Sequence, residues 1–400
     1  RCKAQQKGEI TMKKFISIAL AAVMLAIAAV GFASCGSKVT NYAANNTEFY
    51  IGASGPLTGP AGVYGQAVKN SAQLAVDEIN AAGGLNGVKF KFVMMDDVHD
   101  ASNVATNYTT MYEAGMQVSL GCVTTKPCLE FKTLSHEDNV FFMTPSATAD
   151  AVVEYDNAYQ MCFADEKQGV TAAQFVSENY KGQTIGMLYK SDDEYSTGIR
   201  KQFLANLDKS ITVVEASFSG DTVASFASQI AVLKDCKFIF MPIYYTPASQ
   251  FMTEAKNDVA KDAIYYGCDG LDGIDTAVKG FDISTIPQEV SFLSHFNSKS
   301  TEGASGEFIK KYTEKFGADS LSQFGAAAYD CVYAIYGAMK EAGDKISVTS
   351  SPSDICNALK DVFNGGYTYS GVTGTNIKWT AEGFVSKTAL KYIVKESDAK

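Results

Sequence analysis

The chain has 400 residues, of which 46% are hydrophobic and 20% charged, and a formal net charge of −10. Residues 1–34 contain five basic residues and one acidic residue, so the remainder carries a net charge near −14. A protein with this negative charge is not expected to bind nucleic acids or anionic membrane surfaces. Its length predicts two domains of ordinary size, each able to bury a core.

The first predicted element is a secretion signal. Lys13 and Lys14 precede an apolar run over residues 15–30, and small residues follow up to Cys35. This order is typical of a bacterial signal peptide. The run has 16 residues, fewer than the ~20 that a membrane-spanning helix needs. A cysteine after small residues resembles the lipobox of bacterial lipoproteins, which implies that Cys35 receives the lipid and becomes the first mature residue.

The residues before and after the signal peptide are expected to lie outside the folded body. Met12 is the expected initiator, so residues 1–34 are assigned to upstream residues and the signal peptide. Residues 35–47 are short and polar, which predicts a tether between the lipid and the body. No other long apolar run follows, so we expect a soluble body outside the cytoplasm.

Strand and helix patterns alternate from residue 48 onward. Short apolar or alternating runs predict strands at residues 49–53, 89–95, 118–121 and 140–143. Apolar residues at helical spacing predict helices after these strands, over residues 68–79 and up to about residues 115 and 138. The same order restarts after Phe163, with strands at residues 185–189, 211–216, 238–243 and 264–267.

The last quarter of the body is mainly helical. Helices are predicted near residues 302–316, 320–342 and 352–364, and strands near residues 375–379 and 389–394. Strands regularly separated by helices are typical of parallel sheets with helices on both faces. Two such runs predict an α/β fold with two doubly wound parallel-sheet lobes.

Neither cysteine nor histidine spacing predicts a metal site. The body contains seven cysteines beyond Cys35, an odd number with no C-x-x-C pair, so we expect small buried side chains. Cys122 and Cys128 could form a bridge, but the sequence does not require one. The three histidines are isolated and predict structural roles; they are His99, His136 and His295.

Three loops at predicted strand ends carry polar groups, and ligands bind at the carboxyl ends of parallel strands. Thr125 follows one strand at the start of a helix, where free N–H groups accept a carboxylate. Ser146 and Thr148 follow the neighbouring strand, and Asp269 follows a strand of the second run. Donors for a carboxylate opposite acceptors for an ammonium suit an α-amino acid, although Thr125 could merely cap a helix and Asp269 could be a solvated loop acid.

Several dispersed motifs resemble the leucine/isoleucine/valine-binding family, the type I periplasmic binding proteins that feed ABC importers. The resemblance runs from about residue 48 to residue 393. Its motifs are GPLTGP at 55–60, YG at 64–65, AVDEIN at 75–80, GG at 83–84, DD at 96–97, GCVTT at 121–125, TPSAT at 144–148 and GVTG at 371–374.

The resemblance implies a ligand site. It places the ligand carboxylate at Thr125 and Thr148, and the ammonium at the Ser146 carbonyl, the Thr148 hydroxyl and Asp269. An aromatic side chain that packs on the ligand is implied at one position of the first lobe, Tyr64. Tyrosines from the second lobe are implied at two further positions, although all three could be packing residues; they are Tyr195 and Tyr244.

This chain departs from the family pattern in two places. The aliphatic binders have glutamate where Asp269 stands, so the reach to an ammonium is shorter here. The best-known members have a disulfide at the positions of His99 and Thr124, which this chain cannot form.

The resemblance also implies how the lobes are divided. It predicts three crossings, near Ala164, His295 and Ser386, that form a three-strand hinge. The first lobe is then residues 48–164 plus 296–386, and the second is residues 165–295 plus 387–400. Closure of the lobes over a ligand follows from this arrangement.

The sequence thus predicts a lipid-anchored, extracytoplasmic substrate-binding protein of an ABC importer. It would act as a monomer that binds an amino acid of branched-chain or related type and delivers it to a permease. No nucleophile elbow, P-loop, zinc-helix motif or dinucleotide fingerprint is present, so neither an enzyme nor a cofactor is expected. The alternative is a sensing receptor component that binds an amino acid, amide or small organic acid without transport.

Overall fold

The computed structural model describes residues 39–399. Its first sheet has five parallel strands in the order β2-β1-β3-β4-β5. The strands are β1 (Phe49–Gly55), β2 (Phe90–Asp96), β3 (Val118–Cys122), β4 (Phe141–Thr144) and β5 (Ala158–Gln160). This order places the carboxyl ends of β3 and β4 next to each other.

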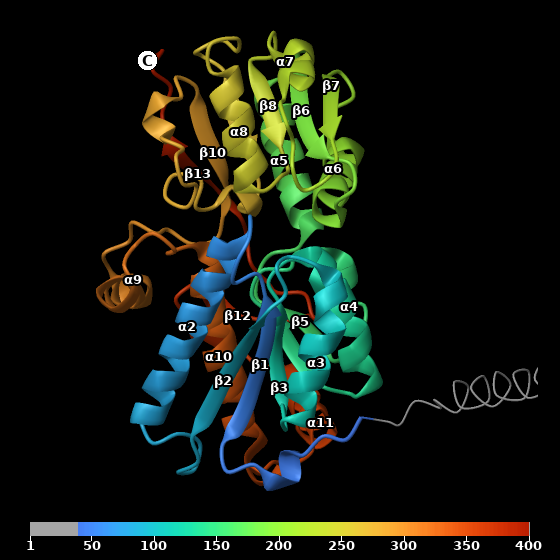
Figure 1. Ribbon diagram of the computed structural model, residues 1–400, viewed down its shortest axis with the longest axis vertical. Coiled ribbons are helices and arrows are strands. Elements are labelled where there is room, and N and C mark those ends of the chain that lie inside the picture. The colour runs from blue at the N-terminus through green and yellow to red at the C-terminus, as the bar shows by residue number, and fades with distance from the viewer. Residues whose placement is uncertain (1–38, 400) are drawn as a thin grey trace, which may run out of the picture. The chain divides into compact units, whose positions relative to one another are not determined.

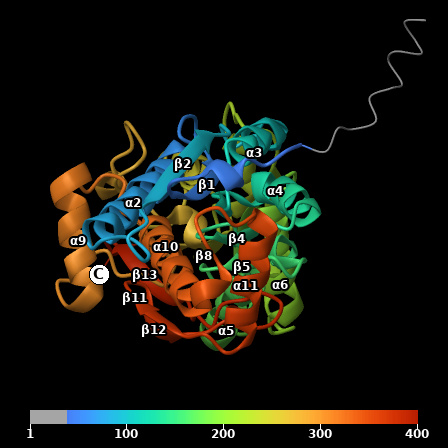
Figure 2. The ribbon, with the colours of Figure 1, turned by 90° about the horizontal axis from the view of Figure 1, so that it is seen from below.

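Helices cover both faces of the first sheet (Figures 1 and 2). The helices are α2 (Gly62–Ala81), α3 (Val104–Glu113), α4 (Thr125–Glu137), α10 (Gln323–Ala342) and α11 (Pro352–Asn364), whereas α9 (Gly303–Phe316) packs against α2. Figure 2 shows α3 and α4 on one side of the sheet and α2, α10 and α11 on the other. Phe49 and Ile51 of β1 pack into the core with α10, whereas Tyr50 packs with α3, because successive strand residues point to opposite faces.

The second sheet has six strands in the order β13-β10-β9-β8-β6-β7. The strands are β6 (Thr184–Lys190), β7 (Thr212–Phe218), β8 (Phe238–Met241), β9 (Ile264–Gly267), β10 (Glu289–Ser294) and β13 (Leu390–Lys395). Helices again lie on both faces, with α5 and α6 in one core and α7 and α8 in another. These helices are α5 (Asp165–Asn179), α6 (Glu194–Asn206), α7 (Ala227–Leu233) and α8 (Tyr245–Ala255).

The predicted α/β class with parallel sheets is confirmed, but three strands of the two large sheets differ from expectation. β5 was not predicted, because its three residues are too few to show an alternating hydrophobic pattern. β10 was not predicted either, because it begins with the buried Glu289 and Ser291 separates its few apolar residues; Lys391 lies 2.7 Å from the Glu289 carboxylate. The last strand, β13, runs antiparallel to β10, so the second sheet is mixed rather than wholly parallel.

The chain passes between the two sheets three times. It leaves the first sheet after β5, returns after β10 and crosses again before β13. A small antiparallel pair, β11 (Tyr369–Gly371) with β12 (Gly374–Ile377), precedes the last crossing. The connections contain residues 164, 295 and 386, although which residues move together stays a prediction.

Part of the predicted tether is folded onto the body. Asn41 Nδ2 donates to the carbonyl oxygens of Tyr112 and Met116 at 2.7 and 2.9 Å. Asn46 Nδ2 donates to the Gly115 carbonyl at 2.9 Å, and Ala43 between them is 2% exposed. Residues 41–46 therefore belong to the same folded unit as the first sheet. Cys35 and the predicted signal lie outside the described residues, and no helix within residues 39–399 could span a bilayer.

Candidate ligand-binding site

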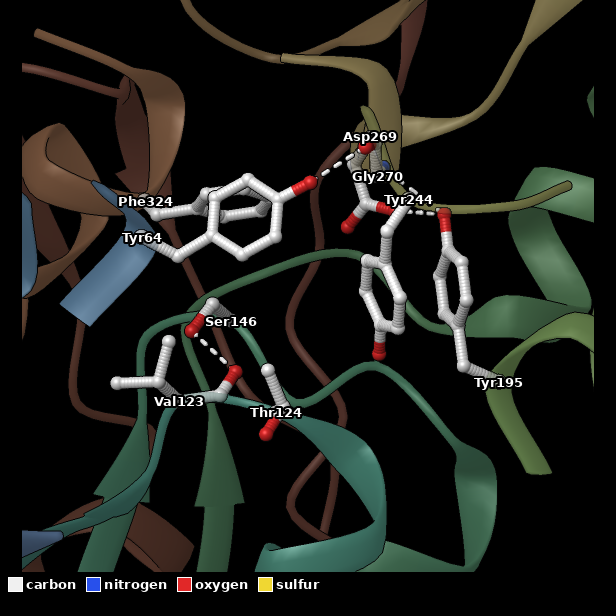
Figure 3. A pocket seen from close by; sticks show the side chains of 9 residues that line it. All are labelled: Tyr64, Val123, Thr124, Ser146, Tyr195, Tyr244, Asp269, Gly270 and Phe324. Carbon is white, nitrogen blue, oxygen red and sulfur yellow. Dashed lines mark hydrogen bonds between the residues drawn. The ribbon is translucent and has the colours of Figure 1, made fainter. Parts of the chain in front are cut away.

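A small cavity lies at the carboxyl ends of strands from both sheets (Figure 3). The side chains around it leave room for little more than a water molecule in this structure, so a metabolite can bind there only when the two walls move apart. Nine residues line it: Tyr64, Val123, Thr124, Ser146, Tyr195, Tyr244, Asp269, Gly270 and Phe324. Asp269 supplies the one carboxyl group among them, and none of the nine is a lysine, arginine or histidine.

The wall from the first sheet is built from the loops after β3 and β4. Val123 and Thr124 connect β3 to α4, and Thr124 is the N-cap of that helix. The Thr124 side chain makes no capping hydrogen bond; its hydroxyl instead lies 2.9 Å from His99 Nδ1. The first N–H groups of a helix have no partner within it, and the helix dipole favours an anion there. This end of α4 can therefore accept a ligand carboxylate.

Hydrogen bonds to strand ends fix the loop after β4. The Ser146 hydroxyl donates to the Val123 carbonyl oxygen at 2.7 Å, as Figure 3 shows. The Thr144 hydroxyl donates to the Cys122 carbonyl at 2.8 Å and accepts from the Ala147 N–H at 3.0 Å. The hydroxyls of this loop thus join β3 to β4 and hold the cavity wall in place.

The opposite wall centres on Asp269, which is 2% exposed and follows β9. Tyr195 Oη donates to Asp269 Oδ1 at 2.8 Å, and the Asp269 N–H donates to Gln168 Oε1 at 3.0 Å. The other carboxyl oxygen points into the cavity (Figure 3). Burial raises the pKa of Asp269 to about 7, because desolvation disfavours the charged form. A cationic ligand group next to this oxygen would favour the ionised carboxylate.

Aromatic rings fill the space around this carboxyl group. The Tyr244 ring stacks on Tyr195 with centroids 4.9 Å apart and planes 13° apart. Phe324, at the start of α10, meets the face of Tyr64 edge-on at 4.8 Å. Tyr64 Oη donates to the Gly270 carbonyl at 2.5 Å, so α2 is bonded directly to the loop after β9. The two walls are thus in contact in this structure.

Five of the seven residues expected at the ligand line the cavity, and two do not. Thr125 is the first residue of α4 and is 2% exposed, next to the lining Thr124. The Thr148 carbonyl accepts from the N–H of Asp165, the first residue of α5, at 2.8 Å. The pKa of the Asp165 carboxyl is raised, mainly by burial and also by the nearby charge of Asp269.

Four lining residues were not named as site residues from the sequence. Val123 and Thr124 belong to the motif at residues 121–125, and Gly270 follows Asp269, so each carried a local signal. Phe324 carried none, because it reaches the cavity from α10, far along the chain. Only the tertiary packing of α10 against α2 places it there.

Cysteines and histidines take no part in a metal site within residues 39–399, where no suitable group of ligands occurs. The seven cysteines of this range are buried and unbridged, including Cys122 and Cys128. The positions where the family's best-known members have a disulfide hold the hydrogen bond between His99 and Thr124. Within the described residues, the site therefore offers a ligand hydrogen-bonding groups, one carboxyl group and aromatic rings.

Comparisons with known proteins identify the family. A family model described as "Periplasmic binding protein" matches residues 48–389. The leucine-, isoleucine-, valine-, threonine- and alanine-binding protein of Pseudomonas aeruginosa is 27% identical over 269 residues, covering 65% of this chain and 69% of that protein. A Leu/Ile/Val-binding protein of Rhizobium johnstonii is 29% identical over 231 residues, covering 56% of this chain and 62% of that protein.

Solved structures agree on the fold. The branched-chain amino acid transporter substrate-binding protein LivJ of Streptococcus pneumoniae, in complex with isoleucine, has a TM-score of 0.74 at 24% identity, covering 88% of this chain and 97% of that chain. The leucine-binding protein LivK of Thermotoga maritima has a TM-score of 0.75 at 19% identity, covering 87% and 95%. The chain belongs to the periplasmic binding protein family, as the match over most of its length shows.

Proposed function

We propose that this protein is the substrate-binding component of an ABC importer and binds an aliphatic α-amino acid in the cavity. The observation that carries the proposal is the position of Asp269, whose free oxygen faces the cavity. The start of α4 lies on the opposite wall. A buried acid opposite a helix N-terminus suits the ammonium and carboxylate of one zwitterion.

The lining also favours a short aliphatic side chain. Val123, Phe324 and the ring of Tyr64 supply apolar surface next to the two polar ends. The relatives support this reading, because their names specify leucine, isoleucine and valine. Within the site, Ser146 is proposed to offer its carbonyl oxygen to the ammonium, since its hydroxyl is already donated to Val123. Thr125 and Thr148 are proposed to contact the ligand after small movements of their loops.

Closure of two lobes is the proposed mechanism. Residues 48–164 plus 296–386 would move as one body and residues 165–295 plus 387–400 as the other. The three connections between the sheets would serve as the hinge. Ligand binding favours the closed form only by as much as the ligand prefers it, and Asp269 and the tyrosines supply that preference from the second wall. The ligand is released unaltered to a permease, without a cofactor.

Location follows from the family and from the N-terminal sequence. Periplasmic binding proteins act outside the cytoplasm, and we propose that this one is held at the membrane by a lipid on Cys35 and acts as a monomer. Metabolic labelling with a radioactive fatty acid tests the anchor. Label in the wild-type protein and none in a Cys35→Ser variant is expected, whereas equal labelling would contradict it.

Isothermal titration calorimetry of the purified protein tests the ligand. The panel contains leucine, isoleucine, valine, threonine and alanine, together with 4-methylpentanoate, which lacks the amine of leucine, and 3-methylbutylamine, which lacks its carboxylate. We expect micromolar or tighter binding of at least one aliphatic amino acid and far weaker binding of both truncated compounds. Equal binding of 4-methylpentanoate and leucine would contradict the role of Asp269.

A further inference from the structure

His99 lies just outside the cavity and contacts a lining residue on each wall. Its Nδ1 atom is 2.9 Å from the hydroxyl oxygen of Thr124, which precedes α4. Its ring meets Tyr244, which follows β8, with centroids 5.5 Å apart and planes at 87°. A hydrogen bond on one side and an edge-to-face ring contact on the other join the first-sheet wall to the second.

The backbone at Val98 and His99 is in an unfavourable conformation, so contacts around it must hold it there. Val98 and His99 have φ angles of 55° and 64°, in the left-handed region that a β-branched residue rarely adopts. Two carboxylates hold the turn. Asp96 Oδ1 accepts from the Val98 N–H and Asp97 Oδ1 from the His99 N–H, each at 2.9 Å. Such strain persists only where surrounding contacts impose it, and it is common at ligand clamps.

The contact also leads toward the buried acid. Tyr244, the ring that His99 touches, stacks on Tyr195, and Tyr195 donates to Asp269. Burial lowers the pKa of His99 and so favours the neutral ring, while the nearby carboxylate of Asp193 acts in the opposite direction. The His99 ring therefore supports Tyr244, which stacks on Tyr195, the residue that donates to Asp269.

We propose that His99 is a positioning residue that ties Thr124 to Tyr244 across the cavity and so slows release of the bound ligand. The inference rests on the proposed function, because it concerns release of the same amino acid. The ligand can leave only when the walls separate, and separation breaks the His99 contact. The contact therefore adds to the stability of the closed form and acts on the rate of opening rather than on the rate of encounter.

Three substitutions separate the two parts of the contact. His99→Ala removes both, His99→Phe keeps a ring for Tyr244, and His99→Asn keeps an amide for Thr124 and tolerates the left-handed backbone. Stopped-flow and calorimetric measurements on the purified protein give the association rate, dissociation rate and Kd for its tightest amino acid. Only the ring contact with Tyr244 joins the two walls, because His99 and Thr124 both belong to the first, so its loss predicts a dissociation rate about two- to tenfold faster in His99→Ala.

The variants should rank according to whether they keep the contact between the walls. The association rate should change little, and His99→Phe should recover part of the slow release, whereas His99→Asn, which keeps only the contact within the first wall, should release ligand about as fast as His99→Ala. His136→Ala is the matched control, because the exposed His136 ring stacks on Tyr155 and does not contact the cavity. It should release ligand at the wild-type rate.

Two results would overturn the inference. One is an unchanged dissociation rate in His99→Ala. The other is a lower melting temperature of the empty protein with no recovery of slow release in His99→Phe, which would indicate a structural role only. If the wild-type protein binds none of the amino acids, the proposed function fails and this inference fails with it; binding by the wild type with unchanged release in His99→Ala overturns this inference alone.

Discussion

The two walls of the cavity differ in what fixes them and in what they offer a ligand. The first-sheet wall is neutral: hydroxyls of Thr144 and Ser146 bond to carbonyls at the end of β3 and hold the loops. The second wall carries the buried carboxyl of Asp269, held by Tyr195 and Gln168. The first wall therefore offers a ligand uncharged hydrogen-bonding groups, whereas the carboxyl group of the second determines which charge the ligand must carry.

Replacing the acid should have the largest effect. Asp269→Asn keeps the size of the side chain but removes the charge, leaving a ligand ammonium without its partner. Loss of one member of a buried charge pair costs about 2–5 kcal/mol, so leucine should bind at least about 30-fold more weakly. Calorimetry with leucine and with 4-methylpentanoate measures this loss.

The des-amino compound should be nearly unaffected by Asp269→Asn. Glu289→Gln is a matched control, because Glu289 is another buried acid beside the second sheet but pairs with Lys391 outside the cavity. It should leave the affinity unchanged. Equal losses for leucine and its des-amino analogue would contradict the ammonium assignment.

The affinity should also depend on pH through the second wall. The pKa of Asp269 is raised to about 7 in the empty site by burial, and a bound ammonium favours the ionised form. Binding therefore releases a proton below this pKa, and the affinity should rise with pH up to about 7 and then level off. Below that pH, one released proton corresponds to about a tenfold loss in affinity per pH unit.

Titrations at several pH values, in two buffers of different ionisation enthalpy, count the protons released. Asp269→Asn should bind more weakly throughout and should lose most of this pH dependence. A flat profile in the wild-type protein, with no proton release at pH 6, would mean that Asp269 is ionised before the ligand arrives.

A smaller effect is expected from the first wall. Ser146→Ala removes the donor to the Val123 carbonyl, which stays buried, so the free energy of unfolding should fall by about 1 kcal/mol. The affinity should fall only a few-fold, because the ligand is expected to use the Ser146 carbonyl. Urea unfolding and calorimetry measure the two quantities. Ser135→Ala is the control, since Ser135 is a buried serine of α4 that bonds the Lys132 carbonyl and does not line the cavity.

The smallest expected change is a gain. Val98 occupies a left-handed conformation, φ 55°, that asparagine tolerates much better. Val98→Asn should therefore raise the free energy of unfolding by up to about 1 kcal/mol, with little effect on affinity. A loss of stability in urea unfolding would show that the Val98 side chain contributes more than its backbone costs.

The same contrast explains how much could be predicted from the sequence. Strand-end loops are local, so Ser146 and Asp269 could be placed at the cavity from the apolar run and polar loop that surround each. Phe324 could not, because no local pattern reports that the start of α10 packs on Tyr64. Among the strands, β10 was missed because Ser291 separates its few apolar residues, and because the charge of the buried Glu289 at its start is balanced by Lys391, on a strand distant in sequence. The features that could not be predicted depend on contacts between residues that are far apart in the sequence.

A crystal structure of the protein with leucine or isoleucine in the cavity tests the central claim most directly. We expect the ligand ammonium about 3 Å from the Asp269 oxygen that faces the cavity, with the ligand carboxylate at the start of α4. A ligand bound in the reverse orientation, or a cavity left empty at saturating amino acid, would contradict it.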